Sequence, residues 1–440
     1  MPTSTDATSL TATERLKSIL SGSIGNLVEW YDWYVYSAFA LYFAKSFFPS
    51  GDAVTQQLNA AGVFAVGFLM RPIGGWLFGV YADRVGRKSA LMLSVTMMCA
   101  GSLLIAVTPT YASIGRAAPA LLLLARIVQG LSVGGEYGTS ATYLSEIAHR
   151  ERRGFYASFQ YVTLILGQLL AIALLVMLQR FFLTDAELER WGWRIPFFVG
   201  ALCALYALYL RRNMSESESF ALQSAQVGER GSFREFLRHR RAVIVVVGLT
   251  MGGTVAFYTY TTYMQKFLVL SAGMTKSTAT LINAGTLFVF MLLQPVLGAL
   301  SDRIGRRPLL LAFGVLGVLS TVPLLHILAD THTAFGAAAL IMLALLIVSG
   351  YTSINAVVKA ELFPAHIRAL GVGFAYSVAV SLFGGTAEVV ALWFKHRDMD
   401  AGFYWYVTAC IACSLAVYAG MRETRDHSLI DRDTAVGRNL

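Results

Sequence analysis

The chain has 440 residues, of which 56% are hydrophobic and only 14% are charged, and its formal net charge is +9. Soluble domains average about 25% charged residues, so this composition excludes an ordinary soluble enzyme. A lipid bilayer explains it, and at about 20 residues per crossing the chain is long enough for roughly twelve helices. The sequence therefore predicts an all-α integral membrane protein with 12 transmembrane helices.

Apolar segments long enough to cross a membrane occur in two groups of six, and each is expected to be a helix because hydrocarbon offers no partners for backbone polar groups. The first group lies at about 22–47, 57–81, 88–108, 117–142, 156–181 and 193–211. The second lies at about 241–266, 278–300, 308–328, 334–358, 369–394 and 402–421. We expect two six-helix halves, 22–211 and 241–421, with a tail at 1–21, a linker at 212–240 and a tail at 422–440.

The basic residues gather in the connections that follow even-numbered segments. Arg84, Arg87 and Lys88 follow the second segment, whereas the connection after the first, 48–56, has no Lys or Arg. The positive-inside rule then places the basic connections, the tails and the linker in the cytoplasm. The excess positive charge is explained by the orientation of the chain in the membrane and by attraction to anionic lipid. No nucleic-acid partner is expected.

The four cysteines all lie in apolar segments, at Cys99, Cys203, Cys410 and Cys413. None has the polar surroundings that suit a metal ligand. Neither disulfides nor a metal site is therefore expected.

A ten-residue pattern, Gly-x-x-x-Asp-Arg-x-Gly-Arg-Lys/Arg, occurs at 79–88 and again at 298–307, after the second segment of each half. A second correspondence follows the fourth segment of each half, where a Glu precedes an Arg by seven residues. Internal repeats are common in secondary transporters, which bind substrate between the repeats near the midplane. The Asp of each loop is expected beside a helix N-terminus, where the macrodipole favours negative charge. We expect these residues to latch the cytoplasmic face as a gate: Gly79, Asp83, Arg84, Gly86, Arg87, Glu146, Arg153, Asp302, Arg303, Gly305, Arg306, Glu361 and Arg368.

The repeated loop resembles the signature of the major facilitator superfamily, and Arg126-Ile-Val-Gln-Gly130 resembles its fourth-helix motif. More specifically, the chain resembles the metabolite:proton symporter family, in stretches that include 25–32, 67–79, 130–140, 154–163, 191–196, 263–266 and 403–408. The resemblance implies the major facilitator fold and proton-driven uptake of a small dicarboxylate such as 2-oxoglutarate, by alternating access, across the bacterial inner membrane. Citrate, shikimate or a zwitterion such as proline or betaine are alternative substrates. A non-transporting membrane receptor is disfavoured because it needs no paired gates.

Two arginines are predicted inside the membrane. Arg71 lies about 12 residues, or roughly 18 Å of helix, before Asp83, and Arg126 lies within the fourth segment. An Arg at such depth costs about 2.5–3.5 kcal/mol on insertion scales, so it should face a polar cavity or a partner. Two guanidiniums suit the two carboxylates of a dianion. The alternative is structural pairing with acidic groups of the first or fourth segment, with Arg126 tuning a proton site.

The acidic residues within the first half are Glu29, Asp32 and Glu136, and at least one is expected to carry the proton. Burial favours the protonated form of a carboxyl group, whereas a nearby Arg favours the ionised form. When substrate binds to that Arg, the Arg stabilises the ionised carboxyl less, so the carboxyl takes up a proton. A fixed salt bridge remains the alternative for each.

In the second half, Tyr258, Tyr351 and Asn355 are candidates to hydrogen-bond substrate oxygens, whereas Lys359 and Glu361 are expected to gate. We expect a monomer with a small anionic metabolite, protons and lipid as its partners, and no cofactor besides the coupling H⁺. Carrying a dianion inward costs about 4.6 kcal/mol per 100 mV, so at least two protons should accompany it.

Overall fold

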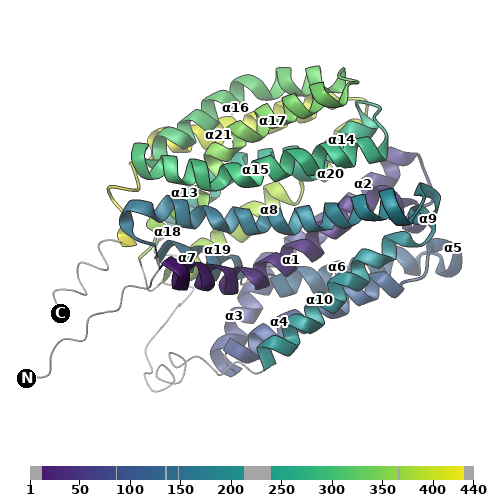
Figure 1. Cartoon of the computed structure of the whole chain (residues 1–440), viewed down its shortest axis with the longest axis horizontal. Coiled ribbons are helices and arrows are strands. Elements are labelled where there is room, and N and C mark those ends of the chain that lie inside the picture. Colours follow the sequence, from purple (N-terminus) through teal and green to yellow (C-terminus); the bar gives the residue numbers. More distant parts are fainter. Residues whose placement is uncertain are drawn as a thin grey trace, which may run out of the picture.

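The computed structural model describes residues 12–85, 87–133, 136–146, 148–212, 239–364 and 367–430. Within them, the regular elements are all helices. Figure 1 shows a helical bundle with the first half (purple to teal) on one side and the second half (green to yellow) on the other. The predicted linker 212–240 lies almost entirely outside the described residues, as do 1–11 and 431–440 of the predicted tails.

The first half contains six crossings, and the second of them is interrupted at Met70. Its helices are α1 (Ala12–Phe47), α2 (Ala53–Leu69), α3 (Arg71–Val85), α4 (Arg87–Val107), α6 (Ala117–Val133), α7 (Glu136–Glu146), α8 (Arg153–Met177) and α10 (Ile195–Arg212). Shorter elements are α5 (Tyr111–Ile114), η1 (Arg150–Arg152), the π-helical η2 (Leu178–Phe182), α9 (Asp185–Arg190) and η3 (Gly192–Arg194).

The second half repeats this arrangement. Its elements are α13 (Arg240–Tyr258), η4 (Thr259–Tyr263), α14 (Met264–Leu270), α15 (Lys276–Ile304), α16 (Arg306–Ala329), α17 (Ala334–Thr352), α18 (Asn355–Glu361), α19 (Arg368–Ala379), η6 (Val380–Gly384), α20 (Ala387–His396) and α21 (Asp400–Gly420). Both η4 and η6 are π-helical turns, which rotate the residues after them and are frequent at functional sites.

The twelve predicted crossings are confirmed. Eight helical stretches in the described part are long and apolar enough to span a membrane, and three shorter apolar helices lie at Met92–Val107, Ala117–Val133 and Gly192–Tyr206. The 36-residue α1 supplies the remaining crossing. Large apolar side chains such as Trp76, Leu202 and Phe335 are exposed on the outside, as expected where lipid, not water, is the solvent.

The halves meet along several helix pairs. α15 lies along α8, α19 packs against α7 and α3, and α20 packs against α2. Glycines allow two of these approaches: a Cβ on Gly138 would lie 2.5 Å from the carbonyl oxygen of Ala369, and one on Gly298 would lie 2.7 Å from that of Gly154. Any larger side chain would separate the helices there.

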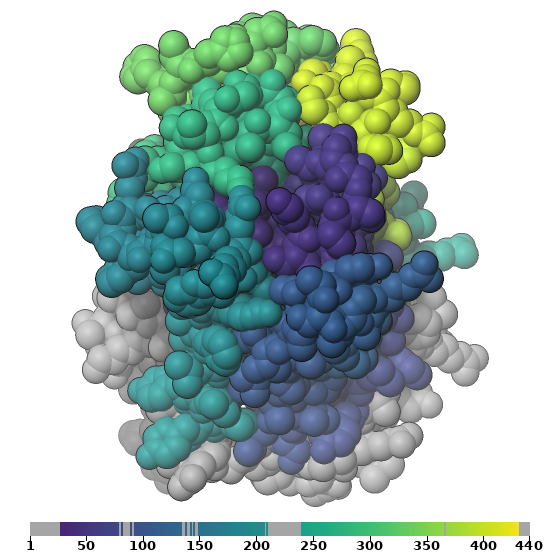
Figure 2. All heavy atoms as spheres, turned by 90° about the vertical axis from the view of Figure 1, so that its right-hand side faces the viewer, coloured from purple at the N-terminus to yellow at the C-terminus, as the bar shows by residue number. Residues whose placement is uncertain are grey.

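The two halves also contact each other at the opposite end of the bundle, away from the basic connections. Figure 2 views this end, where purple segments of the first half lie between blue-teal and green-yellow ones. At this end Lys276 Nζ lies 2.6 Å from Glu189 Oε1, and nearer the middle of the bundle Ser381 Oγ donates to the carbonyl oxygen of Phe68 at 2.5 Å. The described residues therefore connect the halves at both ends.

Candidate substrate and proton sites

Arg71 is the first residue of α3, directly after the break at Met70. Its Nη2 donates to Glu29 Oε1 at 3.2 Å, and both side chains are buried. Its guanidinium carbon lies 4.7 Å from the ring centroid of Trp30 and 5.1 Å from that of Phe68. Arg71 Nη1 makes no hydrogen bond of good geometry within the described part of the chain. A second carboxylate can therefore bind Arg71 without displacing Glu29.

Six buried tyrosines, here called the tyrosine cluster, lie where the two halves meet: Tyr34, Tyr137, Tyr161, Tyr258, Tyr351 and Tyr376. They interact electrostatically with one another, and Arg71 interacts with Tyr34, Tyr258 and Tyr376. Tyr137 stacks on Tyr376 with ring centroids 3.5 Å apart. In the described structure, the hydroxyls of Tyr34, Tyr258 and Tyr351 make no hydrogen bond of good geometry. Apolar walls with a few converging polar groups are typical of small-molecule sites.

Lys359, on α18, is fully buried beside this cluster. Its Nζ donates to Asn355 Oδ1 at 2.6 Å and to the hydroxyl of Tyr137 at 3.3 Å, and lies 4.0 Å from the ring centroid of Tyr376. Sequence reasoning expected this lysine at the gate because it is close to the helix end. Its spacing of four residues from Asn355 places both on one helix face, and this spacing is the signal that could have assigned it to the site.

Arg126 lies inside the first half rather than beside the tyrosine cluster. Its guanidinium carbon is 3.9 Å from the ring centroid of Trp33 and 4.6 Å from that of Tyr36, and its Nη1 donates to Gln129 Oε1 at 2.8 Å. Gln129 Nε2 in turn donates to Asp32 Oδ2 at 2.6 Å. Arg126 and Asp32 are thus linked through one amide side chain.

Asp32, on α1, is buried against α4, α6 and α10. It also accepts a hydrogen bond from Ser102 Oγ, which belongs to α4. Glu136, the third acidic residue predicted for proton coupling, begins α7. Its side chain lies outside the described part of the structure, so its role stays a prediction.

A further buried ion pair, which sequence reasoning missed, lies within the second half and is contacted by Ser37 of the first half. Lys266 Nζ lies 2.6 Å from Glu388 Oε1 and donates to Ser37 Oγ at 3.1 Å. Ser37 Oγ also donates to Glu388 Oε2 at 3.1 Å. Lys266 follows the π-helical turn η4 and Glu388 follows η6, so both turns influence where these side chains point.

At the basic end, Asp302 binds the N-terminus of α8. Its two oxygens accept from the backbone N–H of Gly154 at 2.8 Å and of Phe155 at 2.9 Å, and Arg306 Nη1 lies 2.7 Å from Oδ1. The helix dipole favours a carboxylate there. Gly305 separates α15 from α16 with φ of +97°, a conformation that strains other residues. The carbonyl of Arg303 accepts from Arg425 Nη1 at 2.9 Å.

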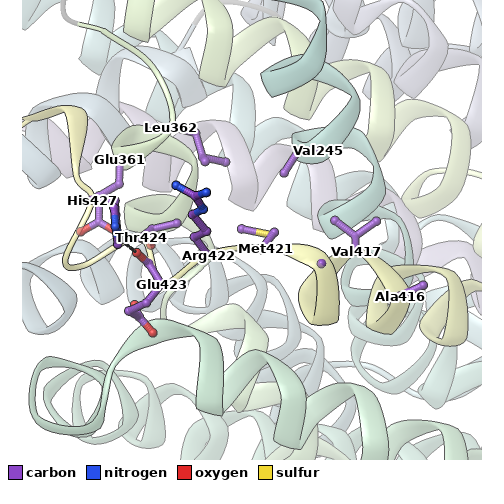
Figure 3. Close-up of a pocket in the computed structure, with 11 residues that line it drawn as sticks. Val245, Glu361, Leu362, Ala416, Val417, Met421, Arg422, Glu423, Thr424 and His427 are labelled. Atoms are coloured by element: carbon purple, nitrogen blue, oxygen red, sulfur yellow. Dashed lines mark hydrogen bonds between the residues drawn. The ribbon is translucent and has the colours of Figure 1, made fainter.

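Glu361 joins this network from α18. Its Oε1 lies 3.7 Å from Arg306 Nη2 and 3.9 Å from Arg153 Nη1, and its Oε2 accepts from Thr424 Oγ1 at 2.6 Å. Figure 3 shows Glu361 and Thr424 beside an open pocket of about 400 Å³ at this end. Arg368 Nε donates to the carbonyls of Ala360 and Phe363, which ties the first residue of α19 to the end of α18.

The first-half copy of the gate is only partly described. Gly79, Asp83 and Arg84 belong to α3, Arg87 begins α4 and Glu146 ends α7, but their side chains lie outside the described part, as does the whole of Gly86. The backbone shows α3 packed against α19, as α15 is packed against α8. Their predicted latch role remains a prediction.

Comparison with known proteins decides the family. A family model described as "Sugar (and other) transporter" matches residues 19–229 and 218–435. The chain belongs to this transporter family. Its fold is that of the major facilitator superfamily: it resembles the proton:xylose symporter XylE bound to 6-bromo-6-deoxy-D-glucose with a TM-score of 0.76, at 18% identity, over 97% of this chain and 100% of that one.

Two bacterial relatives are similar over nearly their whole length. The chain is 57% identical to the alpha-ketoglutarate permease of Escherichia coli K12 over 401 residues, which cover 91% of this chain and 92% of the relative. It is 34% identical to the citrate-proton symporter of Klebsiella pneumoniae over 412 residues, which cover 91% of each. These relatives are transporters and not enzymes, so the predicted family and the non-enzymatic function are confirmed.

Proposed function

We propose that this chain takes up 2-oxoglutarate, or a similar small dicarboxylate, together with protons by alternating access across the bacterial inner membrane. The observation that carries the proposal is the buried guanidinium of Arg71 beside the tyrosine cluster, between the two halves; among the described residues its Nη1 makes no hydrogen bond of good geometry. It supports an anionic substrate, and the 57% identity to a protein named alpha-ketoglutarate permease supports the particular anion. The basic connections support a cytoplasmic location of both termini. No cofactor besides H⁺ enters the proposal, and a monomer contains both halves of the site.

Arg71 binds one substrate carboxylate in this scheme, and Tyr258, Tyr351 and Asn355 supply hydrogen bonds to substrate oxygens. A guanidinium group can form two parallel hydrogen bonds with one carboxylate group. The bromoglucose named for the structural neighbour is uncharged, and at 18% identity that neighbour informs only the fold.

Glu29 is the proton carrier that the geometry favours. At 3.2 Å from Arg71 the Glu29 carboxylate neutralises part of the charge of the same guanidinium, so protonation of Glu29 leaves more of that charge to a substrate carboxylate bound beside it. By linkage, bound substrate then favours the protonated Glu29 to the same extent. Asp32, which Arg126 influences through Gln129, is the candidate for a second proton, and Glu136 remains a third.

Two or more protons per substrate make the cycle work at a negative-inside potential. A dianion alone is opposed by about 4.6 kcal/mol per 100 mV, which two protons cancel. The Asp302 and Glu361 networks then close the cytoplasmic face in one half of the cycle and open in the other, as the two halves rock about the site.

Counterflow in proteoliposomes tests the substrate. Vesicles preloaded with unlabelled 2-oxoglutarate should take up external labelled 2-oxoglutarate, and unlabelled citrate, shikimate or proline should compete weakly. Stronger competition by one of these compounds would assign that compound as the substrate and contradict the proposal.

A further inference from the structure

Lys359 approaches the same tyrosine as Arg71, but from the second half of the molecule. Its Nζ lies 4.0 Å from the ring centroid of Tyr376, while Arg71, from the first half, interacts electrostatically with the same residue. Tyr137, which stacks on Tyr376, is also a hydrogen-bond partner of Lys359. Two cations of different helices thus interact with Tyr376, one ring of this stacked pair.

All described partners of Lys359 are neutral. They are the amide oxygen of Asn355, the hydroxyl of Tyr137 and the aromatic faces of Tyr137 and Tyr376. Among the described residues, no carboxylate lies within ion-pair distance of its Nζ. A buried charge without a counter-ion is costly, and an ionisable residue at membrane depth indicates a functional site.

The gate does not account for this lysine. Glu361, two residues further along α18, is held by Arg306, Arg153 and Thr424 instead. Residues two apart on a helix point in different directions. Lys359 therefore belongs with the tyrosine cluster, while Glu361 belongs with the cytoplasmic network.

We infer that Lys359 binds the second carboxylate of the substrate while Arg71 binds the first. The inference rests on the proposed function and makes it more specific: the site selects dicarboxylates over monocarboxylates because each half contributes one cation. A dicarboxylate bound in this way draws the halves together, whereas a monocarboxylate leaves the charge of Lys359 unpaired.

The variant Lys359→Met tests this inference, since Met is nearly as long and has no charge. Affinities for 2-oxoglutarate and for 2-oxopentanoate, which lacks only the second carboxylate, are measured by inhibition of counterflow. Removing one partner of a buried charge pair typically costs enough to weaken 2-oxoglutarate binding by at least about 30-fold. The affinity for 2-oxopentanoate should change by less than about threefold, because Lys359 makes no ion pair with it. The matched control Lys395→Met removes a lysine paired with Asp400 away from the site and should leave both affinities unchanged.

Three outcomes separate the possibilities. An equal loss for both ligands would show a structural role for Lys359 and overturn the inference. Unchanged 2-oxoglutarate affinity in Lys359→Met would also overturn it, while leaving the proposed function intact. Wild-type protein that fails to exchange 2-oxoglutarate at all would instead contradict the proposed function. Lys359→Arg, which keeps the charge, should retain the preference for the dicarboxylate even where its larger head weakens binding overall.

Discussion

Lys266 and Glu388 form an ion pair of 2.6 Å that joins α14 to α20, and Ser37 of α1 completes it from the other half. Both charged side chains are buried. Alternating access requires the contacts of Ser37 with this pair to break when the far end opens, so the pair lies at a contact that the cycle makes and breaks.

Glu388→Gln should destabilise the protein by about 3–5 kcal/mol, because it leaves the charge of Lys266 buried without a partner. Lys266→Met together with Glu388→Leu removes both charges and should recover most of that loss. The free energies of unfolding of the purified single and double variants give the coupling energy between Lys266 and Glu388. Strictly additive losses in the double variant would show that the two side chains do not interact.

Glu29→Gln mimics the protonated carboxyl beside Arg71. We expect it to retain counterflow of 2-oxoglutarate, because Arg71 remains available, but to lose uphill uptake driven by a pH gradient. The dependence of substrate affinity on pH should flatten, whereas in the wild type the affinity rises as pH falls. The control Glu189→Gln removes a carboxylate at the far end. Normal uphill uptake by Glu29→Gln would move proton coupling to Asp32 or Glu136.

Gly138→Ala should hinder closure at the basic end. The added Cβ would lie 2.5 Å from the carbonyl oxygen of Ala369 and 2.6 Å from Gly373 Cα, so α7 and α19 must separate. We expect a lower maximal transport rate and greater reactivity of a cysteine introduced near the cytoplasmic face. Gly62→Ala is the matched control, since no atom lies within 4 Å of its added Cβ. Equal transport rates in the two variants would show that the close contact between α7 and α19 does not limit transport.

Asp302→Asn weakens the latch between α15 and α8, because the amide provides one acceptor oxygen and no charge for Arg306 and two backbone N–H groups. The maximal rate of uptake should fall by about tenfold or more if one charge-assisted bond of 1.5–3 kcal/mol is lost in the closed state. The KM should change little, since Asp302 lies at the helix end. A large rise in KM at a normal rate would contradict the latch role. Asp330→Asn, at the exposed end of α16, is the control.

The twelve crossings and the repeated basic loops were predictable because they depend on apolar length and on local charge. The interruptions of the helices could not be predicted from the sequence. The break at Met70 and the π-helical turns at 259–263 and 380–384 depend on packing against neighbouring helices. The partner of Glu388 could not be read from the sequence either, since Lys266 is 122 residues away. For Lys359, its distance along the helix predicts a gate residue, whereas its contacts with Asn355, Tyr137 and Tyr376 depend on the direction of the side chain.

Arg126 shows a similar limit. An arginine in a membrane helix indicates a polar partner, but the sequence does not say on which side of the helix the partner lies. The structure surrounds Arg126 with Trp33, Tyr36 and Gln129 inside one half, whereas Arg71 reaches the region between the halves.

Proton coupling to a dicarboxylate is measured by uptake of labelled 2-oxoglutarate into proteoliposomes with an imposed pH gradient, acidic outside, while the membrane potential is clamped at zero. The proposed cycle predicts accumulation above the external concentration, abolished by a protonophore, and no inward movement of net negative charge. Uptake that only equilibrates across the membrane, or that carries net negative charge inward, would contradict it.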